Sequence, residues 1–206
     1  MAQARLGALK AQLQPHFLFN TLNAIVVLVR QQKGRQAEET LARFSDLLRA
    51  VLADMDVQEV TLARELDYLR LYLSIEQLRF SDRLRVEIDV EPDLLDAAVP
   101  HMALQPIVEN SIRYGIGRRA SAGRIRIRAE RRGDSLRVEV QDDGPGFGAP
   151  DAGGADEASG LGLGLANTRA RLRQLYGDAG ELLVGDGAEG GAIVTLVLPF
   201  HLAEET

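Results

Sequence analysis

The sequence of 206 residues contains no cysteine. Disulfide bonds, thiolate metal sites and cysteine nucleophiles are therefore excluded. Histidine is also scarce, so any zinc site would have to combine the three histidines with carboxylates. No apolar run approaches the roughly 18 residues that a membrane-spanning helix needs, and no signal peptide is recognisable at the start. We expect a soluble, cytoplasmic chain.

Basic residues are in deficit, and the net charge is −6. A nucleic-acid clamp needs a basic face, so this balance argues against nucleic acid as a partner, while a local phosphate site is still allowed. The arginine-rich stretch over 124–132 alternates with apolar residues. This alternation indicates one solvated face of a strand rather than a nucleic-acid patch.

Helical periodicity extends over residues 1–81, with leucines at heptad spacing from Leu6 onwards. Two helices joined near Lys33-Gly34 would form a hairpin, and a third would begin after Thr61 as its N-cap. The chain starts inside an expected helix over 2–10 that has no leading cap. We therefore expect a fragment cut from something longer.

The periodicity changes after Asp82. Polar and apolar residues alternate over 83–90, 123–129, 136–140 and 192–198, as in half-buried strands, and helical patterns cover 101–114 and 163–176. An antiparallel or mixed sheet with helices on one face is predicted, which is an α+β layered sandwich. The glycine-rich and alanine-rich stretch over 148–160 is predicted to be a mobile loop.

The first candidate site is the run Gln-Pro-His-Phe-Leu-Phe-Asn that ends at Asn20. Proline inside a helix removes a hydrogen bond and clashes with the preceding turn, so we expect a kink immediately before His16. The heptad series becomes polar at His16, Asn20 and Asn23, and such residues must find partners or face a cleft. A neutral imidazole there is a good nucleophile. The alternative is a hydrogen-bonded core histidine at a kink.

The second candidate site is the expected helix that contains Asn110, Arg113 and Tyr114. These residues are three and four positions apart and therefore share one face of a helix. An amide, a guanidinium and an aromatic ring can hold a metal-bound triphosphate and a flat base. The alternative is an amphipathic helix with a solvated end.

Two glycine-rich segments complete the set. In the segment 142–146, Asp-Asp-Gly-Pro-Gly, a carboxylate follows an expected strand, and the glycine backbone can approach a ligand. In the segment 160–164, Gly-Leu-Gly-Leu-Gly, the glycines precede a helix whose N-terminal amides can hold phosphate oxygens. Each segment alone is also typical of turns. Neither a dinucleotide fingerprint nor a Gly-Lys-Ser/Thr phosphate loop is present.

Taken together and in this order, these segments resemble the sensor histidine kinases of two-component systems, specifically the LytS/YehU-like family. The segment 9–25 is similar to the phosphoacceptor motif, 104–116 to the N box, 142–146 to the first glycine box and 160–172 to the second. The resemblance implies a helical-hairpin dimerisation and phosphotransfer domain over 1–81. It also implies a Bergerat-type α/β two-layer sandwich of the GHKL class over 82–206, which binds ATP with Mg²⁺.

The resemblance also implies partners and residue roles. The chain would form a homodimer and pass a phosphoryl group to a response regulator receiver domain, and only a sensor region outside this chain would meet a membrane. His16 would be phosphorylated, Asn110 would bind Mg²⁺, Arg113 would contact phosphate and Tyr114 would lie beside the adenine. Asp142 would accept a hydrogen bond from the adenine amino group. The remaining glycine-box residues that would line the nucleotide under a lid at 148–160 are Gly144, Gly146, Gly160, Gly162, Gly164 and Leu165.

Two positions depart from common patterns. Tyr114 stands where the family usually has histidine, and Phe17 stands where most histidine kinases carry an acidic residue after the phosphoacceptor. Glu109 is a candidate general base, and Asn20, one turn from His16, is a candidate for orienting the imidazole. Two other readings keep the ATP fold: a GHKL-type ATP hydrolase in which Glu109 activates water, and a non-catalytic nucleotide-sensing dimerisation module.

The other two histidines, His101 and His201, are expected to be ordinary surface or capping residues.

Overall fold

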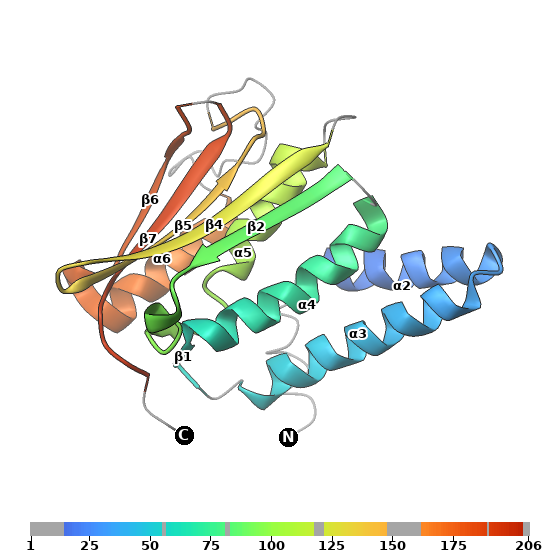
Figure 1. Ribbon diagram of the computed structural model, residues 1–206, viewed down its shortest axis with the longest axis horizontal. Helices are drawn as coiled ribbons and strands as arrows, with labels where there is room; N and C mark the ends of the chain where they lie inside the picture. Colours follow the sequence, from blue (N-terminus) through green and yellow to red (C-terminus); the bar gives the residue numbers. More distant parts are fainter. Residues whose placement is uncertain are drawn as a thin grey trace. The chain divides into compact units, whose positions relative to one another are not determined.

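A computed structural model describes residues 15–54, 57–80, 83–117, 122–147, 162–188 and 190–203 (Figure 1). The chain divides into two compact units: Met1–Gln58 with Leu66–Ser81, the helical unit, and Glu59–Glu65 with Asp82–Thr206, the layered unit. The expected helix over 2–10, the kink before His16 and the loop over 148–160 lie outside the described residues. No helix of the described ranges is long and apolar enough to cross a bilayer.

The helical unit contains a hairpin of α2 (Pro15–Arg30) and α3 (Gly34–Ala53). Lys33 N–H donates to Leu28 O at 2.9 Å in the turn between them, so the hairpin predicted near Lys33-Gly34 is confirmed. Aromatic rings form the centre of the unit. The ring centroid of Phe17 on α2 lies 4.8 Å from that of Tyr72 and 6.4 Å from that of Phe44.

Helix α4 (Leu62–Phe80) is shared by the two units, which divide it after Glu65. Thr61 Oγ1 accepts the N–H of Arg64 at 3.1 Å, which confirms Thr61 as the N-cap. Directly before the helix, β1 (Glu59–Thr61) pairs antiparallel with β3 (Ala98–Pro100) in a small sheet that the sequence pattern did not predict. The first turn of α4 is thereby anchored in the layered unit.

Five strands form the main sheet of the layered unit, in the order β2-β4-β5-β7-β6. Strand β2 pairs parallel with β4, and the other neighbours are antiparallel, so the sheet is mixed. The strands expected from alternation are all present. The bounds of the five strands in the sheet are β2 (Leu84–Val90), β4 (Gly123–Arg132), β5 (Ser135–Asp142), β6 (Glu181–Asp186) and β7 (Ala192–Pro199). Strand β6 was not predicted, because at this sheet edge its residues are mostly exposed and do not alternate.

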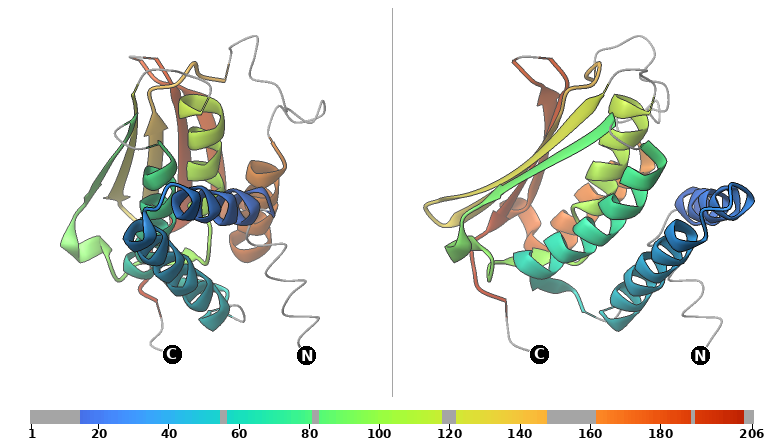
Figure 2. Two further views of the ribbon diagram at one scale, coloured as in Figure 1. Left: turned by 90° about the vertical axis from the view of Figure 1, so that its right-hand side faces the viewer. Right: turned by 45° about the vertical axis from the view of Figure 1, so that its right-hand side comes forward.

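The helices α5 (Gln105–Asn110) and α6 (Leu163–Tyr176) cover one face of this sheet (Figures 1 and 2). The side chains that line this face, Ile125, Ile127 and Leu136, are fully buried. The sequence predicted one helix over roughly 101–114, and this prediction is wrong at the start and in the type of helix after Asn110. Residues 101–104 form a turn, and beyond Asn110 the chain continues as the π-helix η3 (Ser111–Ile116).

Candidate functional site

Asp142 lies at the end of β5 with a buried carboxylate. Its Oδ1 accepts the N–H of Gly144 at 2.9 Å and the N–H of Ala192 at 3.3 Å, and Ser111 forms a side-chain hydrogen bond with it. Burial raises the pKa of Asp142 above its ordinary value, and the hydrogen bonds from Gly144 and Ser111 oppose that rise. A carboxylate fixed in this way is a directional acceptor for a donor group on a ligand.

Two glycines allow the helix that carries the N box, α5 with η3, to approach this carboxylate. A Cβ atom on Gly115 would lie 3.0 Å from Asp142 Oδ1, and a Cβ atom on Gly144 would lie 2.4 Å from the Cα of Gly115. Any side chain at Gly144 would therefore push the two segments apart. The N box and the first glycine box thus meet through their backbones at Asp142.

The polar groups predicted on the N box lie where the helix changes its pitch. Gly117 N–H donates to Ile112 O at 2.7 Å, one residue further back than in an α-helix. Asn110 is partly exposed at the start of this wider turn. Arg113 is exposed, and its guanidinium carbon lies 5.2 Å from the ring centroid of Tyr114. Short π-helical turns occur often at functional sites, and here one presents the three side chains singled out in the sequence.

The loop after Asp142 is anchored to the sheet at two points. Asp143 Oδ1 accepts the N–H of Arg124 at 2.9 Å, and Asp186 Oδ1 accepts the N–H of Phe147 at 2.7 Å. Gly146 has a φ of +82°, and a Cβ atom there would lie 2.6 Å from Asp186 Oδ1. Glycine is therefore required for this close approach. The loop places the backbone of the first glycine box in a defined position.

The second glycine box begins α6 next to the N box helix. Gly162 is the N-cap, with an extended backbone, and Leu165 is buried. A Cβ atom on Gly164 would lie 3.4 Å from the Cβ of Pro106 on α5. Gly160 lies outside the described residues. The N-terminus of α6 therefore packs beside the helix that carries the N box.

The candidate phosphoacceptor group belongs to the other unit. His16 and Asn20 lie one turn apart on α2 of the helical unit. Glu109, by contrast, is buried on α5, and its Oε1 accepts a hydrogen bond from Gln105 Nε2 at 3.0 Å. The structure thus brings the N box and the two glycine boxes together in the layered unit and places the phosphoacceptor motif in the helical unit. The roles of the individual residues stay predictions.

Sequence reasoning missed a buried polar cluster behind the N box. Glu65 of α4 is 2% exposed, and its carboxylate accepts two backbone N–H groups from residues 102–104. His101 is completely buried, so its expected place at the surface is wrong. Its carbonyl oxygen accepts a hydrogen bond from Arg171 of α6. The available signal was a charged residue within the apolar stripe of α4, flanked by Leu62 and Leu66.

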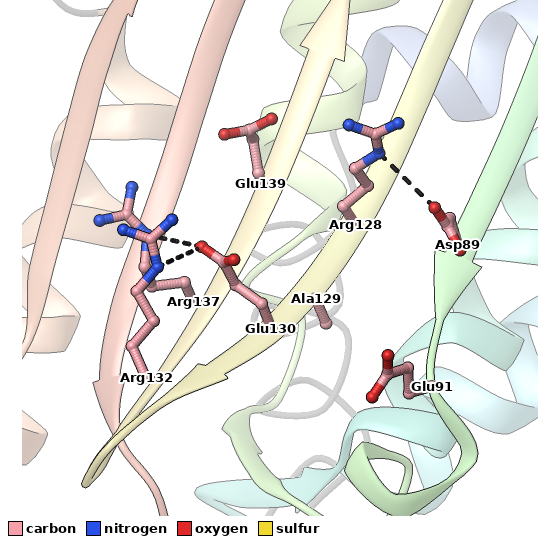
Figure 3. Close-up of a pocket in the computed structure, with 8 residues that line it drawn as sticks. All are labelled: Asp89, Glu91, Arg128, Ala129, Glu130, Arg132, Arg137 and Glu139. Carbon is pink, nitrogen blue, oxygen red and sulfur yellow. Dashed lines mark ion pairs between the residues drawn. The ribbon is translucent and has the colours of Figure 1, made fainter.

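The opposite face of the sheet carries a charged hollow (Figure 3). Several of its charges pair with one another: Glu130 Oε1 lies 2.7 Å from Arg132 Nε, and Asp89 Oδ2 lies 3.6 Å from Arg128 Nε. This pairing agrees with a solvated strand face. In the part of the chain that the structure describes, no group of histidine, aspartate and glutamate side chains could hold a metal ion by itself.

Comparison with solved structures defines the class of fold. The chain is similar to the histidine kinase domain of the blue-light activated histidine kinase of Erythrobacter litoralis, with a TM-score of 0.53 and 22% identity over 95% of this chain and 91% of that one. It is also similar to the histidine kinase AdeS of Acinetobacter baumannii, with a TM-score of 0.51 and 16% identity over 93% of this chain and 97% of that one. The fold is that of a histidine kinase domain.

Two family models match the chain. The model described as histidine kinase matches residues 4–84, and the model of histidine kinase-, DNA gyrase B-, and HSP90-like ATPases matches residues 95–202. The chain belongs to the histidine kinase family and carries its ATPase domain. This membership implies that the layered unit binds ATP. The fixed Asp142 carboxylate and the backbone approach at Gly144 fit a nucleotide base next to the N box.

Curated relatives confirm the resemblance to LytS-like kinases. The chain is 36% identical over 201 residues to the sensor histidine kinase BtsS of Escherichia coli, covering 98% of this chain and 34% of the relative. It is 34% identical over 208 residues to the sensor protein LytS of Oceanobacillus iheyensis, and 32% identical over 211 residues to the sensor histidine kinase/phosphatase LytS of Staphylococcus aureus. These alignments cover 98% and 100% of this chain and 35% and 36% of the relatives. The chain thus spans about a third of the length of these relatives.

Proposed function

We propose that this chain is the kinase core of a sensor histidine kinase, which phosphorylates His16 from ATP and passes the phosphoryl group to an aspartate of a response regulator. The observation that carries the proposal is the contact between the N box and the first glycine box at the buried Asp142 carboxylate, in a chain that also carries a phosphoacceptor motif. Because its substrates, ATP and the receiver domain, are cytoplasmic, we place this part of the protein in the cytoplasm.

The layered unit holds the nucleotide in this proposal. Asp142 accepts a hydrogen bond from the adenine amino group, and Tyr114 lies beside the ring. Arg113 binds phosphate, Asn110 is a ligand of Mg²⁺, and the glycine boxes, with Gly144, Gly146, Gly160, Gly162, Gly164 and Leu165, line the nucleotide. When bound, Mg²⁺ would neutralise part of the negative charge of the phosphates. The partial exposure of Asn110 and Tyr114 and the open position of Arg113 support these assignments.

The helical unit supplies the nucleophile. A neutral ring nitrogen of His16 attacks the γ-phosphorus of ATP, the N–P bond forms, and the bond from phosphorus to the bridging oxygen breaks as ADP leaves with that electron pair. The ring then gives up its N–H proton, for which Glu109 is the candidate base, while Asn20 orients the ring. Catalysis rests on positioning and charge neutralisation. The phosphoramidate bond later breaks as an aspartate of the receiver domain takes the phosphoryl group.

The helical unit also supports a homodimer. Apolar side chains on α2 are exposed along one helical face, including Phe19, Leu22, Val26 and Val29. An apolar stripe of this kind favours burial against another helix. We propose that two hairpins pack into a four-helix bundle, as helical pairs of this type do.

The decisive experiment is incubation with γ-labelled ATP and Mg²⁺, with the native chain compared with His16→Ala. We expect acid-labile, alkali-stable label on the native chain and none on the variant, because a phosphoramidate is hydrolysed by acid. Adding a receiver domain should then transfer the label. Unlabelled protein that releases phosphate steadily, with or without His16, would favour an ATP hydrolase. Nucleotide binding with neither label nor phosphate release would favour a sensing module.

A further inference from the structure

Glu65 binds the turn that leads into the N box helix. Its Oε2 accepts the N–H of Met102 at 2.7 Å, and its Oε1 accepts the N–H of Leu104 at 2.8 Å. Both carboxylate oxygens are therefore used, in a site where the side chain is only 2% exposed. Charge-assisted hydrogen bonds in a buried setting fix backbone position strongly.

The turn needs this support for two reasons. Met102 has a φ of 58°, a left-handed conformation that is unfavourable for a residue other than glycine. Leu104, the N-cap of α5, is buried, so its backbone N–H needs an acceptor. Glu65 supplies a carboxylate there from another helix, and Arg171 of α6 binds the carbonyl of His101 in the same turn. The turn is thus held by side chains from α4 and α6.

If this turn moved, Asn110 and the rest of the N box would move with it. Helix α5 has 6 residues, so Asn110 follows the turn within two helical turns. At the far end, Gly115 packs against the Asp142 carboxylate. The N box is therefore fixed at one end by Glu65 and at the other by the first glycine box.

We propose that Glu65 is a positioning residue for the nucleotide site, which ties the N box to the first turn of α4. Glu65 is the last residue of α4 that belongs to the layered unit, and from Leu66 the same helix belongs to the unit that carries His16. Nucleotide occupancy and the position of the first turn of α4 are then coupled, and the coupling is reciprocal. This inference rests on the proposed nucleotide-binding function.

The test variant is Glu65→Gln, which keeps the size of the side chain but replaces one acceptor oxygen with an amide donor. We expect the Kd for a fluorescent ATP analogue with Mg²⁺, measured at pH 8, to rise about tenfold, because one backbone N–H then faces another donor. The matched control is Asp67→Asn, at an exposed position of α4. In the described part of the chain, the Asp67 carboxylate forms an ion pair with Arg70 at the surface. The control should change the Kd less than about twofold.

Amide hydrogen exchange separates positioning from general stability. In the native chain, the N–H groups of Met102 and Leu104 should exchange slowly and become slower still when the nucleotide analogue binds, whereas Glu65→Gln should lose this nucleotide-linked protection. A variant that melts at a lower temperature but binds the analogue with native Kd while folded would overturn the positioning role. A native chain that binds no analogue, despite protected Met102 and Leu104 amides, would instead overturn the proposed function and the positioning role with it.

Discussion

The layered unit and the helical unit differ in how their exposed apolar side chains are arranged. On α2 of the helical unit, Phe19, Leu22, Val26 and Val29 share one helical face, whereas Leu163, Leu183 and Leu202 of the layered unit lie on separate segments. In the layered unit, the inner residues of the sheet Ile125, Ile127 and Leu136 are 0% exposed beneath α5 and α6. In the helical unit, Phe19 and Val29 on α2 are 67% and 60% exposed. A sheet covered by helices completes its own core, whereas a hairpin with an open apolar stripe does not. In the proposed function, the nucleotide site therefore lies within one chain, and the open stripe on α2 is the surface proposed for a second copy.

The largest effect should come from placing a charge on the open stripe. Val26→Glu puts a carboxylate at the centre of the proposed bundle in both copies, and we expect the dimer dissociation constant to rise about a thousandfold or more, because an unpaired charge is costly to bury. Sedimentation equilibrium measures the constant. Gln36→Glu, at an exposed polar position of α3, is the matched control and should leave it unchanged. A Val26→Glu chain with a native dimer constant would remove the stripe from the interface.

The next effect concerns the layered unit alone. A Cβ atom on Gly191 would lie 1.8 Å from the carbonyl oxygen of Asp142, whereas one on Gly190 would meet nothing within 4 Å, and both residues have positive φ. We expect Gly191→Ala to lower the free energy of unfolding by about 3 kcal/mol or more and Gly190→Ala by about 1 kcal/mol. Urea unfolding measures both values. If both variants lost the same free energy of unfolding, the contact between a Cβ atom on residue 191 and the carbonyl oxygen of Asp142 would add nothing to the cost of the positive φ.

A smaller effect should separate ligand binding from folding. Asp142→Asn keeps the shape of the side chain but removes the charge, and we expect the Kd for ATP to rise about tenfold to a hundredfold while the dimer constant stays native. Asp143→Asn is the control, since an amide oxygen can still accept the N–H of Arg124. Isothermal titration calorimetry gives the Kd for ATP of both variants. Similar Kd values for the two variants would argue against Asp142 as the base-binding residue.

The two units also differ in how far they could be predicted from the sequence. The hairpin, the N-cap at Thr61 and four strands of the sheet follow from periodicity, because apolar spacing reports which face of an element is buried. Strand β6 could not be predicted in this way, because an exposed edge strand has no alternation of polar and apolar residues. The π-helix after Asn110 escaped as well, since it keeps the residue types of an α-helix and changes only the hydrogen-bond spacing.

The residues of the candidate site could be predicted from the sequence, but the contacts between them could not. Motifs identified Asn110, Asp142 and the glycines, but only the structure shows that Gly115 and Gly144 meet at the Asp142 carboxylate. Glu65 lies 39 residues before Leu104, the residue whose N–H it accepts. Contacts between residues so far apart leave no local pattern, so the support of the N box could not be derived from periodicity.

The last prediction concerns the protonation of this support. Burial raises the pKa of Glu65 to about 7, although Arg171 and the N–H groups of Met102 and Leu104 lower it. Between its ordinary pKa of 4.5 and about 7, the folded state therefore holds a proton that the unfolded state has released. The free energy of unfolding should fall as pH rises through this window, by at most about 1.4 kcal/mol per pH unit, and level off above it.

Comparing the native chain with Glu65→Gln isolates this titration, because every other group is common to both. The difference in the free energy of unfolding, from urea titrations between pH 5 and pH 8, should shift in favour of the glutamine variant as pH rises. Nucleotide affinity should move the opposite way in the native chain, since only the ionised carboxylate accepts both N–H groups of the turn. Stability curves that stay parallel across this range would mean that Glu65 titrates as it does in the unfolded chain.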